Sequence, residues 1–153
     1  MLSIGFCQIH RTVSKWNRHS IERIVCRYHR FLLYRWVLCS WCGQVLCDNI
    51  LKSQDVLINL AALIGIPYSY KASRSYVETN ITGCLNILNS AIKNKVRQVI
   101  QISTSEIYGS GQFFPMNEKH PQFAQSPYAA SKIGADQLAL SYWNSFKTPI
   151  KII

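Results

Sequence analysis

Short apolar runs and longer segments with helical spacing alternate along the chain from residue 51 onward. Residues 55–60 form an apolar run typical of a strand buried on both faces of a parallel sheet, and 96–103 and 149–153 predict further strands. Residues 75–94 and 128–143 carry apolar side chains three and four positions apart, which predicts two helices. This alternation predicts a right-handed parallel α/β unit that binds ligands at the carboxyl ends of its strands.

The composition changes sharply near residue 50. Residues 1–50 contain no Ala and no Pro but hold five of the six Cys and three of the four Trp, whereas the rest holds nine Ala and all five Pro. We interpret the two parts as having different origins. Residues 1–50 are expected to be an atypical segment that is not native to the domain, from a frameshift or a misassigned start, and residues 51–153 a partial domain.

The net charge of +10 is spread along the chain, with +5 before residue 51 and +5 after it, and no two Lys or Arg residues are adjacent. A nucleic-acid partner is therefore not expected. The apolar run 31–47 is shorter than a membrane span and is interrupted by Arg35 and Gln44, and the N-terminus does not resemble a secretory signal. We expect no membrane partner, reduced cysteines and a cytoplasmic location.

Four residues of the first segment have the spacing of zinc ligands, namely Cys26, His29, Cys39 and Cys42. No Gly or Pro stands within either pair to form a turn, and bulky aromatic residues surround them, so we predict no metal site. The alternative is a non-enzymatic module in which residues 1–50 bind zinc, nucleic acid or a protein partner.

Tyr128 and Lys132 are one helical turn apart and therefore lie on one face of the predicted helix, which Pro127 is suited to begin. An ammonium group beside a phenol favours the phenolate, so this pair is a candidate proton acceptor for a sugar or alcohol hydroxyl near neutral pH. The alternative is one aromatic residue and one solvated charge on a surface helix.

Four motifs, in this order and spacing, resemble those of the NAD-dependent epimerase/dehydratase family of extended short-chain dehydrogenases/reductases. They are Asn59-Leu60-Ala61-Ala62, Thr79-Asn80-Ile81-x-Gly83, Ser103-Thr104-Ser105-Glu106-Ile107-Tyr108-Gly109 and Tyr128-x-x-x-Lys132. Residues 52–153 are most similar to nucleotide-sugar 4,6-dehydratases of the legionaminic-acid type. The resemblance implies an α/β fold: a partial Rossmann-like parallel sheet with flanking helices, lacking the glycine-rich first βαβ unit and the C-terminal substrate domain.

The resemblance implies a role for each catalytic residue. Tyr128 takes the proton of the sugar C4 hydroxyl, Lys132 assists it and binds the nicotinamide ribose, and Thr104 holds the same hydroxyl. Glu106 removes the C5 proton so that water leaves from C6, which favours a dehydratase over a 4-epimerase. Ser105 stands where some sugar dehydratases carry Asp, so the group that protonates the leaving hydroxyl stays open.

The resemblance also implies binding residues for NAD, rather than NADP, and for a nucleoside-diphosphate sugar. The residues expected at the cofactor are Asn59, Ala61, Ala62, Asn80, Ser103, Tyr128 and Lys132, and those expected at the substrate are Tyr68, Ser69 and Ser105. Asn80 has an alternative role in capping or bending its helix. The only glycines before Leu51 are Gly5 and Gly43, so the glycine-rich loop that cradles the pyrophosphate is missing and NAD binding is expected to be impaired.

We therefore expect a fragment of an NAD-dependent nucleotide-sugar 4,6-dehydratase that is inactive alone, from a family whose full-length members form homodimers. The alternatives are a nucleotide-sugar 4-epimerase fragment and the non-enzymatic module described above. Stoichiometric zinc that is lost on Cys39→Ser would favour the module.

Overall fold

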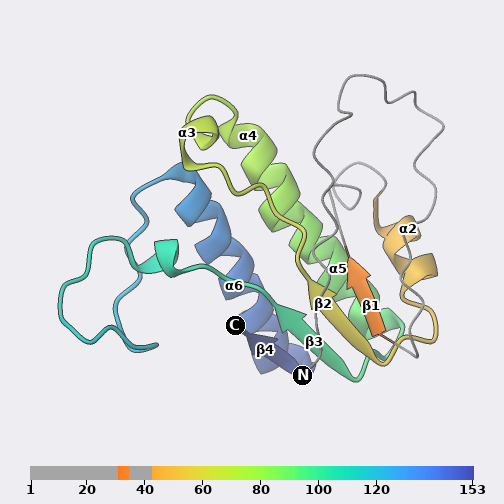
Figure 1. The fold of residues 1–153 in the computed structure, drawn as a ribbon. Coiled ribbons are helices and arrows are strands. Elements are labelled where there is room, and N and C mark those ends of the chain that lie inside the picture. The colour runs from red at the N-terminus through yellow and green to blue at the C-terminus, as the bar shows by residue number, and fades with distance from the viewer. Residues whose placement is uncertain (1–30, 35–42) are drawn as a thin grey trace, which may run out of the picture.

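The computed structural model describes residues 31–34 and 43–153, and its centre is a four-stranded parallel sheet with the strand order β1-β2-β3-β4 (Figure 1). The strands are β1 (Phe31–Tyr34), β2 (Val56–Asn59), β3 (Gln98–Gln101) and β4 (Ile150–Ile152). The last three lie within the predicted runs 55–60, 96–103 and 149–153. β1 was not predicted, and it pairs in parallel with β2.

Two helices, α5 (Gly83–Lys93) and α6 (Pro127–Phe146), pack against the sheet and build the hydrophobic core. Leu57 of β2 and Val99 of β3 belong to this core, and each is 1% exposed or less. Their strand neighbours are only half-buried, so burial alternates along β2 and β3. The expectation of a strand buried at every position is therefore wrong for 55–60, because the core lies against alternate residues of the strand.

The predicted helix 75–94 is observed as three consecutive segments. α4 (Ser73–Tyr76) leads into the π-helical segment η1 (Val77–Thr82), and α5 follows without a break. A π-helical turn contains one extra residue and widens the helix locally, and such turns are frequent at functional sites. The periodic apolar spacing predicted the helix, but it did not show this change of winding.

The helix α6 carries the candidate Tyr-Lys pair and begins with a well-formed cap. The Ser126 hydroxyl accepts a hydrogen bond from the Ala129 N–H at 3.0 Å, and Pro127 occupies the first turn, where its missing N–H is not needed. Lys147 ends the helix in the left-handed conformation, with φ 54°. The cap fixes where the helix begins, and so fixes the position of Tyr128 in its first turn.

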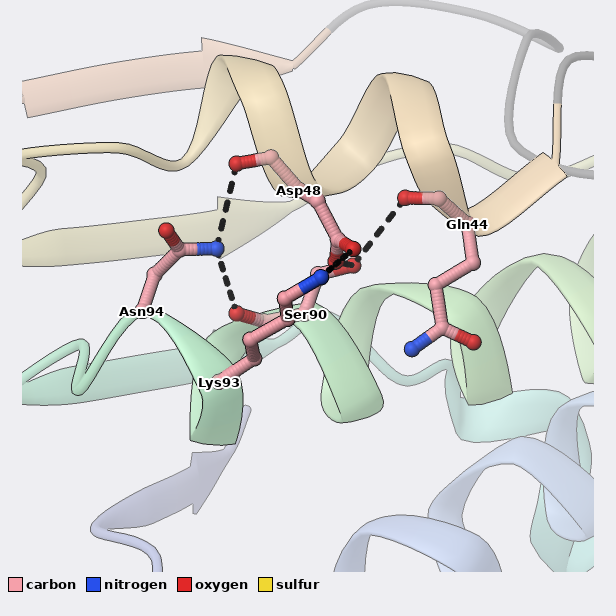
Figure 2. A network of polar contacts seen from close by, with 5 residues as sticks. All are labelled: Gln44, Asp48, Ser90, Lys93 and Asn94. Carbon is pink, nitrogen blue, oxygen red and sulfur yellow. Dashed lines mark hydrogen bonds and ion pairs between the residues drawn. The ribbon is translucent and has the colours of Figure 1, made fainter.

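A short helix, α2 (Gly43–Ile50), is fastened to α5 by a polar cluster (Figure 2). The carboxylate of Asp48 accepts hydrogen bonds from the Ser90 hydroxyl and the Lys93 ammonium, both at 2.6 Å. These donors hold the pKa of the Asp48 carboxyl below its ordinary value. The adjoining residues Cys47 and Leu51 are buried in the core. α2 thus packs with the sheet domain although it precedes the boundary predicted at residue 50.

The proposed zinc residues Cys26, His29, Cys39 and Cys42 lie outside the described residues. Within residues 31–34 and 43–153, no group of His, Cys, Asp and Glu side chains is arranged to hold a metal ion. In the same part of the chain, no helix has the length and apolar character needed to cross a membrane.

Candidate active site

The candidate site lies where β3 ends and α6 begins. β3 leads through Ile102, Ser103 and Thr104 into the 3-10 helix η2 (Ser105–Tyr108), and η2 packs against α6 (Figure 1). The third and fourth predicted motifs therefore lie side by side, as the parallel topology requires of groups at the carboxyl ends of strands.

Tyr128 is 6% exposed and packs against a second tyrosine that the sequence did not single out. The ring of Tyr76, in α4, meets the Tyr128 ring edge-on with 6.2 Å between centroids. The Tyr76 hydroxyl donates to the Gly65 carbonyl at 2.6 Å, so this ring is held from both ends. The sequence gives no signal of this contact between Tyr76 and Tyr128, because it depends on the packing of α4 against α6.

Lys132 is only 5% exposed, and its ammonium donates a hydrogen bond to the Ile102 carbonyl at the end of β3. Burial lowers the pKa of Lys132, while the nearby Asp136 carboxylate raises it. The alternative interpretation of Lys132 as a solvated surface charge is therefore wrong. The side chain is a buried cation one turn from Tyr128.

Asp136 is a buried acid that the sequence analysis missed. It is 2% exposed, and its Oδ2 accepts a hydrogen bond from the Ser103 hydroxyl. Its Oδ1 is buried without a hydrogen-bond partner among the described residues. Burial raises the pKa of Asp136, while Ser103 and Lys132 act in the opposite direction. The available signal was its spacing, because Asp136 follows Lys132 by one more helical turn.

Asn59, which was expected at the cofactor, takes part in a buried amide network. Its side-chain nitrogen donates to Gln101 Oε1 at 2.8 Å, and its side-chain oxygen accepts from the Ala61 N–H at 3.2 Å. The Cys84 thiol lies 3.6 Å from the same Gln101 oxygen, and burial raises the pKa of this thiol to about 12. These contacts shape the half-buried turn at Ala61 and Ala62.

Asn80 connects three segments of the chain from within the π-helical turn. Its side chain accepts from the Leu63 N–H at 2.8 Å and donates to the Leu63 carbonyl at 3.1 Å. It also donates to the Ser131 hydroxyl of α6 at 2.8 Å. Asn80 thus fastens the loop after β2 to the helix that carries Tyr128 and Lys132, which is a longer-range role than the capping or bending considered above.

The three residues expected at the substrate differ in exposure. Tyr68 is 58% exposed, whereas Ser69, in α3 (Ile66–Ser69), is fully buried and its hydroxyl donates to the Ile66 carbonyl at 2.6 Å. Ser105 is exposed, as is Glu106 in the same 3-10 helix. The Thr104 hydroxyl oxygen accepts from the Glu106 N–H at 3.3 Å. The catalytic candidates thus combine a buried pair on α6 with an exposed acid on η2.

The parallel sheet and the buried Tyr-Lys pair beside η2 are typical of a Rossmann-fold unit of the short-chain dehydrogenase/reductase type. The family described as "GDP-mannose 4,6 dehydratase" matches residues 5–153, and the chain belongs to this family. The resemblance to NAD-dependent epimerases/dehydratases is thereby confirmed. Since the matched range includes most of residues 1–50, the division at residue 50 stays a prediction.

Individual relatives are similar over about two thirds of this chain. A dTDP-D-glucose 4,6-dehydratase of Dictyostelium discoideum is 35% identical over 120 residues, which cover 70% of this chain and 28% of that protein. A crystal structure of a dTDP-glucose 4,6-dehydratase from Streptomyces venezuelae with NAD bound superposes with a TM-score of 0.70 at 31% identity, covering 72% of this chain and 34% of the other. A Bacillus cereus UDP-glucuronic acid 4-epimerase in complex with UDP-glucuronic acid and NAD gives 0.66 at 30%, covering 69% and 34%. The chain spans about a third of the length of these relatives.

The residues present fit one end of an NAD molecule better than the other. A buried tyrosine and a buried lysine one turn apart provide a phenol and an ammonium for a ribose and its nicotinamide. The pyrophosphate of NAD is ordinarily bound by a glycine-rich loop at a helix N-terminus. Residues 1–50 contain only two glycines, Gly5 and Gly43, and so no such loop. Any contribution of this chain to NAD binding is therefore expected at the nicotinamide end.

Proposed function

We propose that this chain carries the catalytic segment of an NAD-dependent nucleotide-sugar 4,6-dehydratase. The observation that carries the proposal is the packing of η2, with Thr104 and Glu106, against the helix that bears the buried pair Tyr128 and Lys132. This arrangement supplies a proton acceptor, a neighbouring cation and a separate carboxylate within adjoining segments. These three groups are what proton removal from the C4 hydroxyl and from C5 of one sugar requires.

Each residue has a defined step in the proposed reaction. Tyr128 takes the proton of the sugar C4 hydroxyl, and Thr104 orients that hydroxyl from the end of β3. Lys132 provides a buried amino group one helical turn from Tyr128, to bind the nicotinamide ribose. When bound, NAD would accept the hydride from C4 and return it to C6 after water has left. The resulting C4 carbonyl acidifies the C5 proton, which Glu106 removes as water leaves from C6.

Glu106 distinguishes the dehydratase from the second candidate, a 4-epimerase. The similarity to a UDP-glucuronic acid 4-epimerase, with a TM-score of 0.66 against 0.70 for the dehydratase, supports that candidate nearly as well. An epimerase needs only oxidation and reduction at C4, so it has no use for a carboxylate directed at C5. The exposed position of Glu106 on η2 leaves it available to a bound sugar.

The test uses purified full chain, mixed with NAD and dTDP-glucose, with the products followed by mass spectrometry and NMR. A second sample is a chimera in which residues 43–153 replace the aligned segment of the Streptomyces venezuelae enzyme, which supplies the remainder of that longer chain. In the chimera we expect loss of one water and formation of a 4-keto-6-deoxy sugar. Tyr128→Phe removes the base and is the matched negative control.

Three outcomes would contradict the proposal. Inversion at C4 without loss of water would identify an epimerase segment. Product formation that survives Glu106→Gln would show that another group removes the C5 proton. The absence of any turnover in both the full chain and the chimera would reject catalysis by this segment altogether.

A further inference from the structure

Two side chains one turn apart on α6 hold two successive residues at the end of β3. The Lys132 ammonium donates to the Ile102 carbonyl, and the Asp136 carboxylate accepts from the Ser103 hydroxyl. Residues four apart share one face of a helix, so one cation and one anion fasten the same strand end. That strand end leads directly into Thr104.

The burial of this pair requires a physical explanation. Lys132 is 5% exposed and Asp136 is 2% exposed, and transfer of either charge out of water is costly unless it is compensated. Ser103 satisfies one carboxylate oxygen, while Oδ1 has no hydrogen-bond partner in the described part of the chain. A nearby cation is the compensation that buried carboxylates ordinarily have, and Lys132 is the cation at hand.

We propose that Asp136 is a positioning residue for the proposed reaction, whose carboxylate is the counter-charge to the Lys132 ammonium one turn away and whose bond to Ser103 fixes the backbone before Thr104. The inference rests on the proposed function of Lys132. It adds a third member, one further turn along α6, to the face that carries Tyr128 and Lys132.

The electrostatics of the surrounding elements agree with this role. Burial alone lowers the pKa of Lys132, and the Asp136 carboxylate opposes that effect. The facing titratable group on α5 is Cys84, whose raised pKa of about 12 keeps the thiol uncharged where a lysine titrates. On α6 the other titratable neighbour is Tyr128. Asp136 is therefore the group that provides negative charge near the ammonium.

The test measures the titration of Lys132 directly by NMR of its Nζ in the full chain labelled with ¹⁵N-lysine, the signal being assigned by its loss in Lys132→Arg. We expect Asp136→Asn to lower the pKa of Lys132 by about one unit or more, because the amide keeps the shape but not the charge. Glu118→Gln, which removes an exposed carboxylate, is the matched control and should leave this pKa unchanged. Ser103→Ala keeps the carboxylate and should lower the pKa less than Asp136→Asn does.

A second measurement does not depend on the folding of any variant. In the unmodified chain, the ¹³Cγ signal of Asp136 should shift as Lys132 loses its proton. An unchanged Lys132 pKa in Asp136→Asn, or a ¹³Cγ signal that ignores the titration of Lys132, would overturn the inference. Neither measurement needs cofactor or turnover, so failure here is distinct from failure of the dehydratase assay.

Discussion

Two clusters of the same three residue types join segments of this protein, and they differ in how fully their hydrogen bonds are satisfied. The α2 cluster consists of Asp48, Ser90 and Lys93, and the α6 cluster consists of Asp136, Ser103 and Lys132. In the α2 cluster the serine and the lysine both donate to the carboxylate (Figure 2). In the α6 cluster only the serine does, and the lysine donates to a backbone carbonyl instead.

The difference is visible in the direction of two pKa shifts. The donors around Asp48 lower its pKa, as expected of a group whose contacts serve to fasten one helix to another. Burial raises the pKa of Asp136 because its single hydrogen bond and the Lys132 charge do not offset the loss of water. Perturbed, incompletely satisfied groups are typical of functional sites, whereas the satisfied cluster is structural.

The largest expected effect is on the rate of catalysis, which should depend on Lys132 and not on Lys93. Lys132→Met in the chimera should reduce dehydration of dTDP-glucose about 100- to 10,000-fold, because the buried amino group one turn from Tyr128 is removed from the proposed acid-base machinery. Lys93→Met is the matched control, since Lys93 is exposed and pairs with Asp48 of the α2 cluster, and it should leave the rate unchanged. Equal rate losses in the two variants would show that the clusters do not differ in function.

The two aspartates should contribute to stability with opposite dependence on pH. For Asp48, whose folded-state pKa is lowered, the stabilisation is complete above the ordinary value of 3.8 and is lost as pH falls through the folded value. For Asp136, whose folded-state pKa is raised, the contribution is complete below 3.8 and is lost as pH rises through the folded value.

Urea unfolding of wild type, Asp48→Asn and Asp136→Asn between about pH 2 and pH 8 measures this contrast. The free energy lost on Asp48→Asn should grow with rising pH in the acid range. The free energy lost on Asp136→Asn should shrink, or change sign, with rising pH. Parallel pH profiles for the two variants would contradict the comparison.

The two serines provide a smaller test of the same contrast. Ser90→Ala leaves Asp48 paired with Lys93 and should cost about 1 kcal/mol of unfolding free energy. Ser103→Ala leaves both oxygens of a buried carboxylate without a hydrogen bond and should cost more, about 1–3 kcal/mol. Unfolding at a single neutral pH decides the order, and a larger loss from Ser90→Ala would reverse our assignment of the two clusters.

Much of the fold followed from the sequence because its cause is local. Apolar spacing predicted β2, α5 and α6, and Pro127 correctly indicated the start of α6. β1 and α2 were not predicted because the unusual composition of residues 1–50 set that segment apart from the domain. The docking of α2 depends on contacts with α5, which no local pattern encodes.

The candidate site was predictable only where residue order carried information. The spacing of Tyr128 and Lys132 correctly placed them on one helix face. It did not predict that Lys132 is buried, because that burial depends on the end of β3 packed against the side chain. Asp136 was missed because an acid on a helix is usually exposed. The partners of Asn80 lie 17 and 51 positions away, so they arise from tertiary packing alone.

The smallest expected effect concerns Gly134, which lies on α6 between Lys132 and Asp136. A Cβ at this position would come within 2.8 Å of the Ile81 Cδ1 atom in η1, so the glycine permits close approach of the two helices. The obstructing atom ends a flexible side chain, and alanine also gains about 1 kcal/mol of helix propensity over glycine. Gly134→Ala should therefore change the unfolding free energy by less than about 1 kcal/mol.

The same variant should leave the pKa of Lys132 unchanged, because the Ile81 side chain moves and the charged pair does not. A shifted Lys132 pKa in Gly134→Ala would show that the α6 cluster depends on the spacing between helices and not on the Asp136 charge alone.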